Sequence, residues 1–142
     1  MARALVDATV VIAFADPDDE DHDRGEAIVR AIDHGKLPTG VILHEALVEV
    51  LNFVNERQGD EKATHLLDSL EESAHYRLPY APKGNVGRSR ALFRQYPEFS
   101  FGDALQAAFM ESEGIEYIYS FDDDFDAVDG LTRLDTAENP FA

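Results

Sequence analysis

The strongest constraint on this chain is its alternation of short apolar segments with longer stretches of helical periodicity. Leu5 and Val6 form a short apolar segment that ends at Asp7, and a second one ends near Tyr119. Between them, apolar side chains recur every three or four residues, as they do on the buried face of an amphipathic helix. This alternation predicts an α/β fold, in which helices form a layer on each face of a central, mostly parallel sheet.

The same pattern predicts where individual elements lie. Ser100 and Asp103 have the spacing of a capping box, which marks the start of a helix that ends at Gly114. Asp60 has the residue type of a helix N-cap. We expect helices over Thr9–Phe14, Ala27–Ile32, Val41–Val54, Asp60–Leu70 and Lys83–Tyr96, and extended segments at Leu5–Val6, Tyr76–Tyr80, Ile115–Tyr119 and Leu131–Leu134.

Chain length and cysteine content narrow the class further. A chain of 142 residues is the size of one domain with a substantial core, so residues 1–142 are predicted to form a single domain. The chain has no cysteine, which excludes disulfide scaffolds, thiolate metal sites and cysteine nucleophiles. Any metal ion must therefore be bound by oxygen or imidazole ligands.

The chain is strongly acidic. Its 12 lysines and arginines face 29 aspartates and glutamates, which gives a net charge of −17. Binding of polyanions through bulk charge is therefore disfavoured. An acidic surface with few lysines is typical of proteins dissolved in concentrated salt, where the Debye length falls to about 3 Å. The composition predicts a halophilic source, which we take to be an archaeon.

The beginning of the chain and its hydropathy bear on location. The first residues reach an acid, Asp7, too early for a signal peptide, and no apolar run approaches the roughly 20 residues that span a bilayer. We expect a cytoplasmic protein without membrane contact.

Four acidic residues occupy corresponding positions in the predicted fold. Asp7 and Asp122 follow strands, whereas Glu45 and Asp103 lie in the first turns of helices. In a parallel sheet the strand ends and these helix starts share one edge, so we expect the four carboxylates to converge there. Converging carboxylates need cations to stay ionised, and Mg²⁺ or Mn²⁺ prefers such oxygen ligands.

Each acid also has a structural explanation or a rival nearby. Asp103 completes a capping box, which by itself explains an acid at that position. Glu49 competes with Glu45, and Asp124 competes with Asp122 in a loop rich in acids. The metal site is therefore predicted from the group of acids and not from any single member.

One segment runs against the overall charge. From Ser73 to Pro97 there is no acidic residue, and a basic flank beside an acidic metal site suits a phosphodiester substrate. The alternative is a half-buried segment with incidental arginines. Tyrosines near this segment could stack on unpaired bases, although core packing is the more common role. The bases are Arg77, Lys83, Arg88, Arg90 and Arg94, and the tyrosines are Tyr76, Tyr80 and Tyr96.

Four segments in this order resemble the PIN domain family, especially the VapC-type toxin ribonucleases. They are Leu5–Thr9, Val41–Leu47, Phe101–Ala104 and Tyr119–Phe125, and the resemblance extends over residues 3–135. It implies a PIN-like three-layer α/β/α fold. Matched by position, the family's acidic metal ligands are Asp7, Glu45, Asp103 and Asp122, and its small hydroxyl residue near the metal is Ser120.

The resemblance implies an endoribonuclease that depends on Mg²⁺ or Mn²⁺ and hydrolyses RNA phosphodiester bonds through a metal-activated water. It also implies a homodimer and a small antitoxin protein as partner. Two alternatives stay open: a Mg²⁺-dependent phosphatase, and a PIN-like module that binds RNA or protein without catalysis. The phosphatase is weakened because Thr9 stands where one such phosphatase family has a second aspartate.

Overall fold

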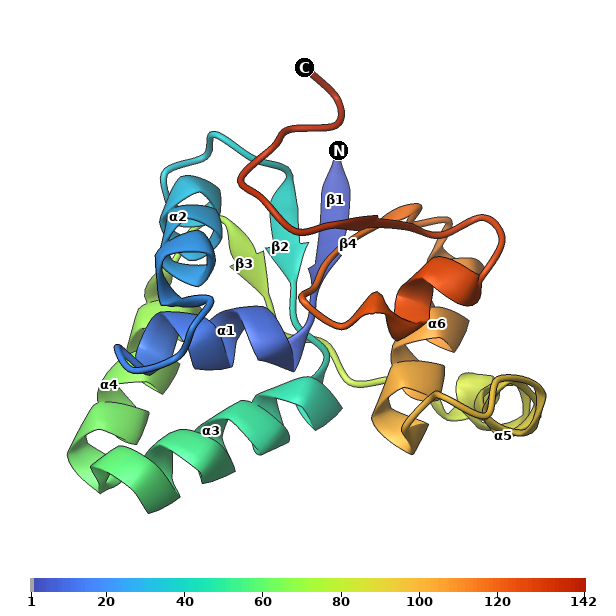
Figure 1. Cartoon of the computed structure of the whole chain (residues 1–142), viewed down its shortest axis with the longest axis horizontal. Helices are drawn as coiled ribbons and strands as arrows, with labels where there is room; N and C mark the ends of the chain where they lie inside the picture. Colours follow the sequence, from blue (N-terminus) through green and yellow to red (C-terminus); the bar gives the residue numbers. More distant parts are fainter. Residues whose placement is uncertain (1) are drawn as a thin grey trace.

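Five parallel strands form one sheet in a computed structural model that describes residues 2–142 (Figure 1). Their order across the sheet is β3-β2-β1-β4-β5, so the first strand of the chain lies at the centre. All four neighbouring pairs are parallel. The strands are β1 (Arg3–Val6), β2 (Thr39–Val41), β3 (Tyr76–Arg77), β4 (Tyr117–Tyr119) and β5 (Thr132–Leu134).

Helices cover both faces of the sheet and complete three layers. Four helices pack on one face and two on the other, each group around its own cluster of buried apolar side chains (Figure 1). The first group is α1 (Ala8–Ala15), α2 (His22–Asp33), α3 (His44–Gln58) and α4 (Asp60–Glu72); the second is α5 (Val86–Gln95) and α6 (Phe101–Glu113), with short 3-10 turns at η1 (Lys83–Asn85) and η2 (Asp123–Ala127). The predicted three-layer α/β/α class with a parallel sheet is confirmed.

The last three residues of strand β1 are all apolar because helices cover both of its faces. Ala4 and Val6 point into the core beneath the first helix group, and Leu5 points into the core beneath α6. All three side chains are fully buried. A strand covered on both faces has no polar side, so it appears in the sequence as a continuous apolar run.

The start of α6 follows the predicted capping box. The Ser100 hydroxyl accepts a hydrogen bond from the backbone N–H of Asp103 at 3.1 Å, and the Asp103 carboxylate accepts one from the backbone N–H of Ser100 at 3.0 Å. Gly114 ends the helix in the left-handed conformation, with φ at 67°. The sequence prediction for this helix is confirmed at both ends.

Some predicted boundaries are wrong. Val41 belongs to β2 and not to the following helix, which begins at His44. Asp60 is the first residue of α4, and Gly59 is its N-cap, with φ at 95°. The extended segment at Tyr76 forms a strand of only two residues, and the stretch from Lys83 divides into η1 and α5. No described helix has both the length and the apolar character needed to cross a membrane.

Candidate functional site

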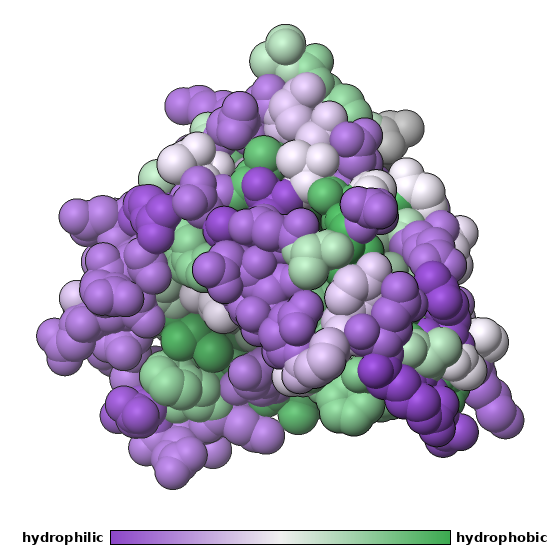
Figure 2. Space-filling view, turned by 45° about the vertical axis from the view of Figure 1, so that its right-hand side comes forward, coloured by the Kyte–Doolittle hydropathy of each residue, from purple (hydrophilic) through white to green (hydrophobic). Residues whose placement is uncertain are grey.

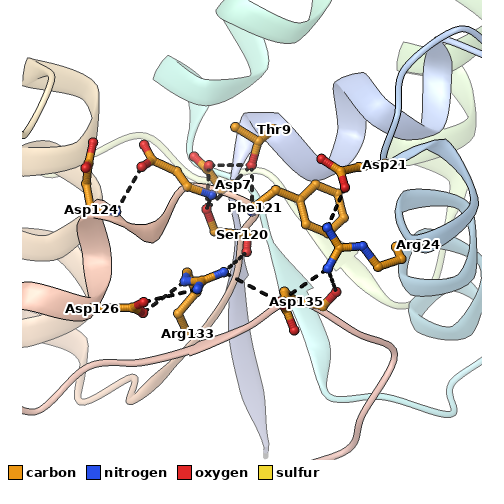
Figure 3. A network of polar contacts seen from close by, with 11 residues as sticks. Asp7, Thr9, Asp21, Arg24, Ser120, Phe121, Asp124, Asp126, Arg133 and Asp135 are labelled. Atoms are coloured by element: carbon orange, nitrogen blue, oxygen red, sulfur yellow. Dashed lines mark hydrogen bonds and ion pairs between the residues drawn. The ribbon is translucent and has the colours of Figure 1, made fainter.

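Asp7 lies at the carboxyl end of the central strand and is held by side chains from three parts of the chain (Figure 3). Its Oδ2 accepts hydrogen bonds from the Thr9 hydroxyl at 2.7 Å and the Ser120 hydroxyl at 2.9 Å. Its Oδ1 accepts one from the Gln106 amide at 2.9 Å. Only 5% of the residue is exposed. These donors fix the orientation of a buried carboxylate that has no cationic partner among residues 2–142.

A cluster of three carboxylates lies at the same edge of the sheet. Asp103, Asp122 and Asp124 each offer an oxygen, and these oxygens lie within 4.8 Å of one another. Asp103 is in the first turn of α6, and Asp122 is the N-cap of η2. The backbone N–H of Asp124 donates to Asp122 Oδ1 at 3.0 Å. We call these three residues the unpaired acids, because no salt bridge of the described chain includes them.

The electrostatics of this cluster are unfavourable in the absence of a cation. The pKa of Asp103 is raised to about 6, first by burial and then by the charges of Asp122 and Asp7, against the lowering effect of the Ser100 hydrogen bonds. The pKa of Asp124 is also raised, by desolvation and by its contact with Asp122. Raised pKa values mean that the site favours neutralisation, which a proton or a cation can supply.

Ser120 connects Asp7 to the unpaired acids. Its hydroxyl donates to Asp7 Oδ2 and accepts from the backbone N–H of Asp122 at 3.0 Å. The side chain is completely buried at the end of β4. The predicted small hydroxyl residue, Ser120, therefore lies between Asp7 and Asp122.

Glu45 and Glu49 occupy successive turns of α3 and have different surroundings. Glu45 Oε1 accepts a hydrogen bond from the backbone N–H of Ala81 at 3.3 Å. Burial and the charge of Asp7 raise the pKa of Glu49. The charge of Asp7 thus raises the pKa of Glu49, whereas Glu45 binds the chain segment between β3 and α5.

Two residues of the site were not anticipated from the sequence. Gln106 is 4% exposed and binds Asp7, and its Oε1 has no hydrogen-bond partner within residues 2–142. A signal was available, because Gln106 stands three residues after Asp103 on the same face of α6. Arg133 donates from Nη1 to the backbone carbonyl of Ser120 at 3.2 Å, a contact for which the sequence carries no local signal.

Arg133 belongs to a second group of charges beside the site, drawn together in Figure 3. Its guanidinium donates two hydrogen bonds to Asp126, at 2.9 and 3.1 Å. Arg24 bonds to Asp21, reaches Asp135 at 3.3 Å, and lies over the Phe121 ring at 4.7 Å. We call the acids of this group the paired acids: they are Asp21, Asp126 and Asp135.

The five basic residues predicted to contact RNA differ in whether they bind other groups of the same chain. Arg77 Nη1 donates to the backbone carbonyls of Ala74 and Tyr76, and Arg88 forms a bidentate contact with Glu111 on α6. Lys83 is exposed at the start of η1. Arg90 and Arg94 are exposed on α5 and form no ion pair within the described part of the chain. Two of the five are therefore engaged within the chain itself.

Solved structures with a similar fold include bacterial toxins. VapC20 of Mycobacterium tuberculosis, described as a sarcin-ricin loop cleaving toxin, has a TM-score of 0.74 at 24% identity, covering 87% of this chain and 93% of that one. VapBC2 of Rickettsia felis, bound to a DNA fragment from its promoter, has a TM-score of 0.69 at 13% identity, covering 93% and 97%. A toxin–antitoxin complex from Klebsiella pneumoniae has 0.66 at 17%, covering 96% and 98%. These likenesses show a shared fold.

Comparison of the sequence with protein families gives a more specific result. No curated protein matches the chain. The family described as PIN domain matches residues 4–131, which is most of the chain and includes Asp7, both α3 glutamates and the unpaired acids. The chain belongs to the PIN domain family.

Proposed function

We propose that this protein is an endoribonuclease dependent on Mg²⁺ or Mn²⁺ and acts as the toxin of a toxin–antitoxin pair. The observation that carries this proposal is the group of unpaired acids, whose oxygens lie within 4.8 Å of one another beside Asp7. Membership of the PIN domain family and the fold shared with toxins support it.

The ligand types at the site fit a hard divalent cation. Every candidate ligand is a carboxylate oxygen, the type that Mg²⁺ and Mn²⁺ prefer. Asp7 Oδ2 already accepts two hydrogen bonds and Oδ1 only one, so Oδ1 is the oxygen available to a cation. The unpartnered Oε1 of Gln106 provides an acceptor for an ordered water next to it.

We assign Asp7, Asp103 and Asp122 as ligands, with Asp124 beside Asp122. For the fourth acid we favour Glu49 over Glu45, because the charge of Asp7 acts on Glu49 while Glu45 is bonded to Ala81. The chemistry that a bound cation supplies in such a site is activation of a water for attack on phosphorus and stabilisation of the leaving oxygen.

The protein's own residues prepare the site for that chemistry. Thr9, Gln106 and Ser120 hold the Asp7 carboxylate in one orientation. The capping box fixes Asp103 at the start of α6, and Ser120 ties the Asp122 backbone to Asp7. Ligands held this firmly need little rearrangement when they bind.

The remaining expectations belong to the same proposal. The favoured contacts for the RNA backbone are Lys83, Arg90 and Arg94, and Arg77 and Arg88 are weaker candidates because of their internal contacts. The toxin–antitoxin structures with a similar fold support a small antitoxin partner. We also predict a homodimer, a cytoplasmic location, a halophilic archaeal source and a single domain over residues 1–142.

The test compares two aspartates that differ in pairing. Asp7→Asn removes a proposed ligand, and Asp126→Asn removes an acid that is bound to Arg133. With single-stranded RNA and Mn²⁺, we expect products with a 5′ phosphate, loss of cleavage in EDTA and its return with Mn²⁺. Asp7→Asn should lower the rate at least about 100-fold, the scale found when one stabilising group is lost. Asp126→Asn should retain most of the activity.

Three results would contradict the proposal in different ways. Cleavage that survives both EDTA and Asp7→Asn would exclude a metal mechanism. Preference for phosphomonoesters over RNA would favour the phosphatase. RNA binding without any cleavage, in protein that has bound Mn²⁺, would favour the non-catalytic module.

A further inference from the structure

Tyr80 differs from the other tyrosines near the acid-free segment. Tyr76 is 5% exposed, and its hydroxyl donates to the backbone carbonyl of Val29 at 2.9 Å. Tyr96 packs against Phe99, with the ring centroids 5.2 Å apart. Tyr80 is 68% exposed, the highest value among the exposed large apolar and aromatic residues of the described chain. Core packing therefore explains the first two rings and leaves Tyr80 unexplained.

One face of the Tyr80 ring packs against a neighbouring ring, and the backbone on both sides of Tyr80 is hydrogen-bonded. The Tyr80 ring lies against the His44 ring, with centroids 4.3 Å apart and planes inclined by 33°. The backbone N–H of His44 donates to the Pro79 carbonyl at 2.8 Å, and Glu45 accepts from the backbone N–H of Ala81 at 3.3 Å. Both residues next to Tyr80 in the chain are thus bonded to α3. A ring fixed in this way loses little conformational freedom when a ligand stacks on it.

The position of this ring relates it to the proposed catalytic site. Helix α3 begins just after β2, next to the central strand that ends at Asp7. Glu45 binds Ala81 in the segment after β3, and β3 runs parallel to β2 and β1, so its carboxyl end shares an edge with Asp7. Figure 1 shows the segment between β3 and α5 crossing this end of the sheet. The exposed ring therefore lies at the edge that carries the acids.

The charge of the protein makes such a ring useful for binding RNA. Hydrophilic residues dominate the face drawn in Figure 2, and the net charge of the chain is −17. Arg24, Arg88 and Arg133 are bound to acids of the same chain. Attraction to phosphates is limited under these conditions, whereas stacking on a base does not depend on phosphate charge.

We propose that the exposed face of Tyr80, supported by His44, is a stacking site for one unpaired base of the RNA substrate. This inference rests on the proposed nuclease function and adds a contact to a base, away from the scissile phosphate. It also implies that the substrate is single-stranded where it crosses α3, because a base in a duplex has no free face.

The test measures binding in EDTA, where the proposed cleavage cannot proceed. The probes are a fluorescent single-stranded oligoribonucleotide and a strand of the same length and backbone without bases. We expect Tyr80→Ala to weaken binding of the first strand about 5- to 150-fold, the range that corresponds to the loss of one stacked base. Binding of the abasic strand should not change. Tyr80→Phe, which keeps the ring, should bind both strands as the parent protein does.

Phe141→Ala is the matched control, because Phe141 is also an exposed ring, at 54%, and lies near Arg3 and Tyr117 at the opposite edge of the sheet. It should leave binding of both strands unchanged. Circular dichroism checks that each variant is folded.

Several outcomes would overturn the inference. They are equal losses for both strands, no loss for Tyr80→Ala, or a similar loss for Phe141→Ala. A change in sedimentation of Tyr80→Ala without a change in RNA binding would instead assign the ring to a protein interface. These experiments distinguish failure of the stacking site from failure of the nuclease proposal. If the protein cleaves RNA but Tyr80→Ala binds RNA as the parent protein does, only the stacking site is refuted. If binding depends on the bases but no RNA is cleaved, only the nuclease function is refuted.

Discussion

The paired and unpaired acids differ in how their charge is compensated, and members of both groups surround Ser120 in Figure 3. Arg133 lowers the pKa of Asp126 through a hydrogen-bonded ion pair. Asp103 has no such partner in the described chain, and its pKa is raised to about 6. The pKa values of these two aspartates are thus shifted in opposite directions. The comparison teaches that the presence of an arginine, more than residue type, separates a structural acid from a candidate ligand.

The paired acids and Asp7 are also linked by a chain of hydrogen bonds. Arg133 binds Asp126 and the Ser120 carbonyl, and the Ser120 hydroxyl binds Asp7. The paired acids therefore hold Arg133 in place, and Arg133 helps to hold the turn that positions Asp7. The following three predictions test this division, beginning with the largest effect.

Arg133→Gln should destabilise the fold most. It removes a bidentate contact with Asp126 and a hydrogen bond to Ser120 from a side chain that is only 17% exposed. Hydrogen bonds to charged groups contribute about 1.5–3 kcal/mol each, and partial exposure reduces this, so we expect a loss of about 2–3 kcal/mol in the free energy of unfolding. Urea denaturation measures it. A loss no larger than that of an exposed arginine would contradict the supporting role.

Asp103→Asn should have the opposite effect on stability and raise the free energy of unfolding. The pKa of Asp103 rises from 3.8 in its ordinary state to about 6 in the fold, so the ionised form opposes folding above pH 6. With allowance for solvent screening, the variant should be more stable than the parent protein by about 1–2 kcal/mol at pH 7.5 in EDTA.

This advantage should shrink as the pH falls from about 6 to about 4, because the parent protein then takes up the proton itself. Urea denaturation at pH 7.5 and pH 4.5 gives the two values. Added Mn²⁺ should stabilise the parent protein more than the variant. A variant that is less stable at both pH values would show that capping by Asp103 outweighs charge repulsion.

Arg88→Gln should have the smallest effect on stability. Arg88 and Glu111 form an exposed pair, and such pairs contribute about 0–1 kcal/mol. Because Arg88 is engaged with Glu111, its loss should also leave the salt dependence of RNA binding nearly unchanged. The matched variant Arg90→Gln/Arg94→Gln should flatten the slope of log K against log salt by up to about 0.7 per lost contact. Equal slopes for the two variants would remove the distinction between engaged and free arginines.

Much of the fold can be read from local sequence. The apolar run before Asp7 and the capping box at Ser100 are encoded by neighbouring residues, and both were predicted correctly. Strand β2 was missed because its three residues include Gly40 and carry no run of apolar side chains. Its strand conformation comes from pairing with β1 and β3, and a side chain at Gly40 would come within 2.9 Å of the Tyr76 ring.

The candidate site also has features that the local sequence predicts and features that only the packed structure shows. Asp7, Asp103 and Asp122 are recognisable because acids at strand ends and helix starts meet at one edge of a parallel sheet. The choice between Glu45 and Glu49 could not be made, because both lie on one face of α3 and only the packed structure shows that Glu45 binds Ala81 while the charge of Asp7 raises the pKa of Glu49. The bond from Arg133 in β5 to the Ser120 carbonyl likewise depends on the tertiary structure and leaves no local signal in the sequence.

The central position of β1 has a consequence for the order of events during synthesis. Leu5 pairs with Ile118, and Asp7 receives hydrogen bonds from Gln106 and Ser120. Strand β1 is therefore made well before its neighbour β4, without which the sheet cannot be completed, and contacts so distant in sequence form slowly. A growing chain that has not reached Ser120 contains Asp7 but lacks the partners that orient it. If the proposed activity is correct, the nascent protein cannot cleave RNA until the ribosome has passed Ser120.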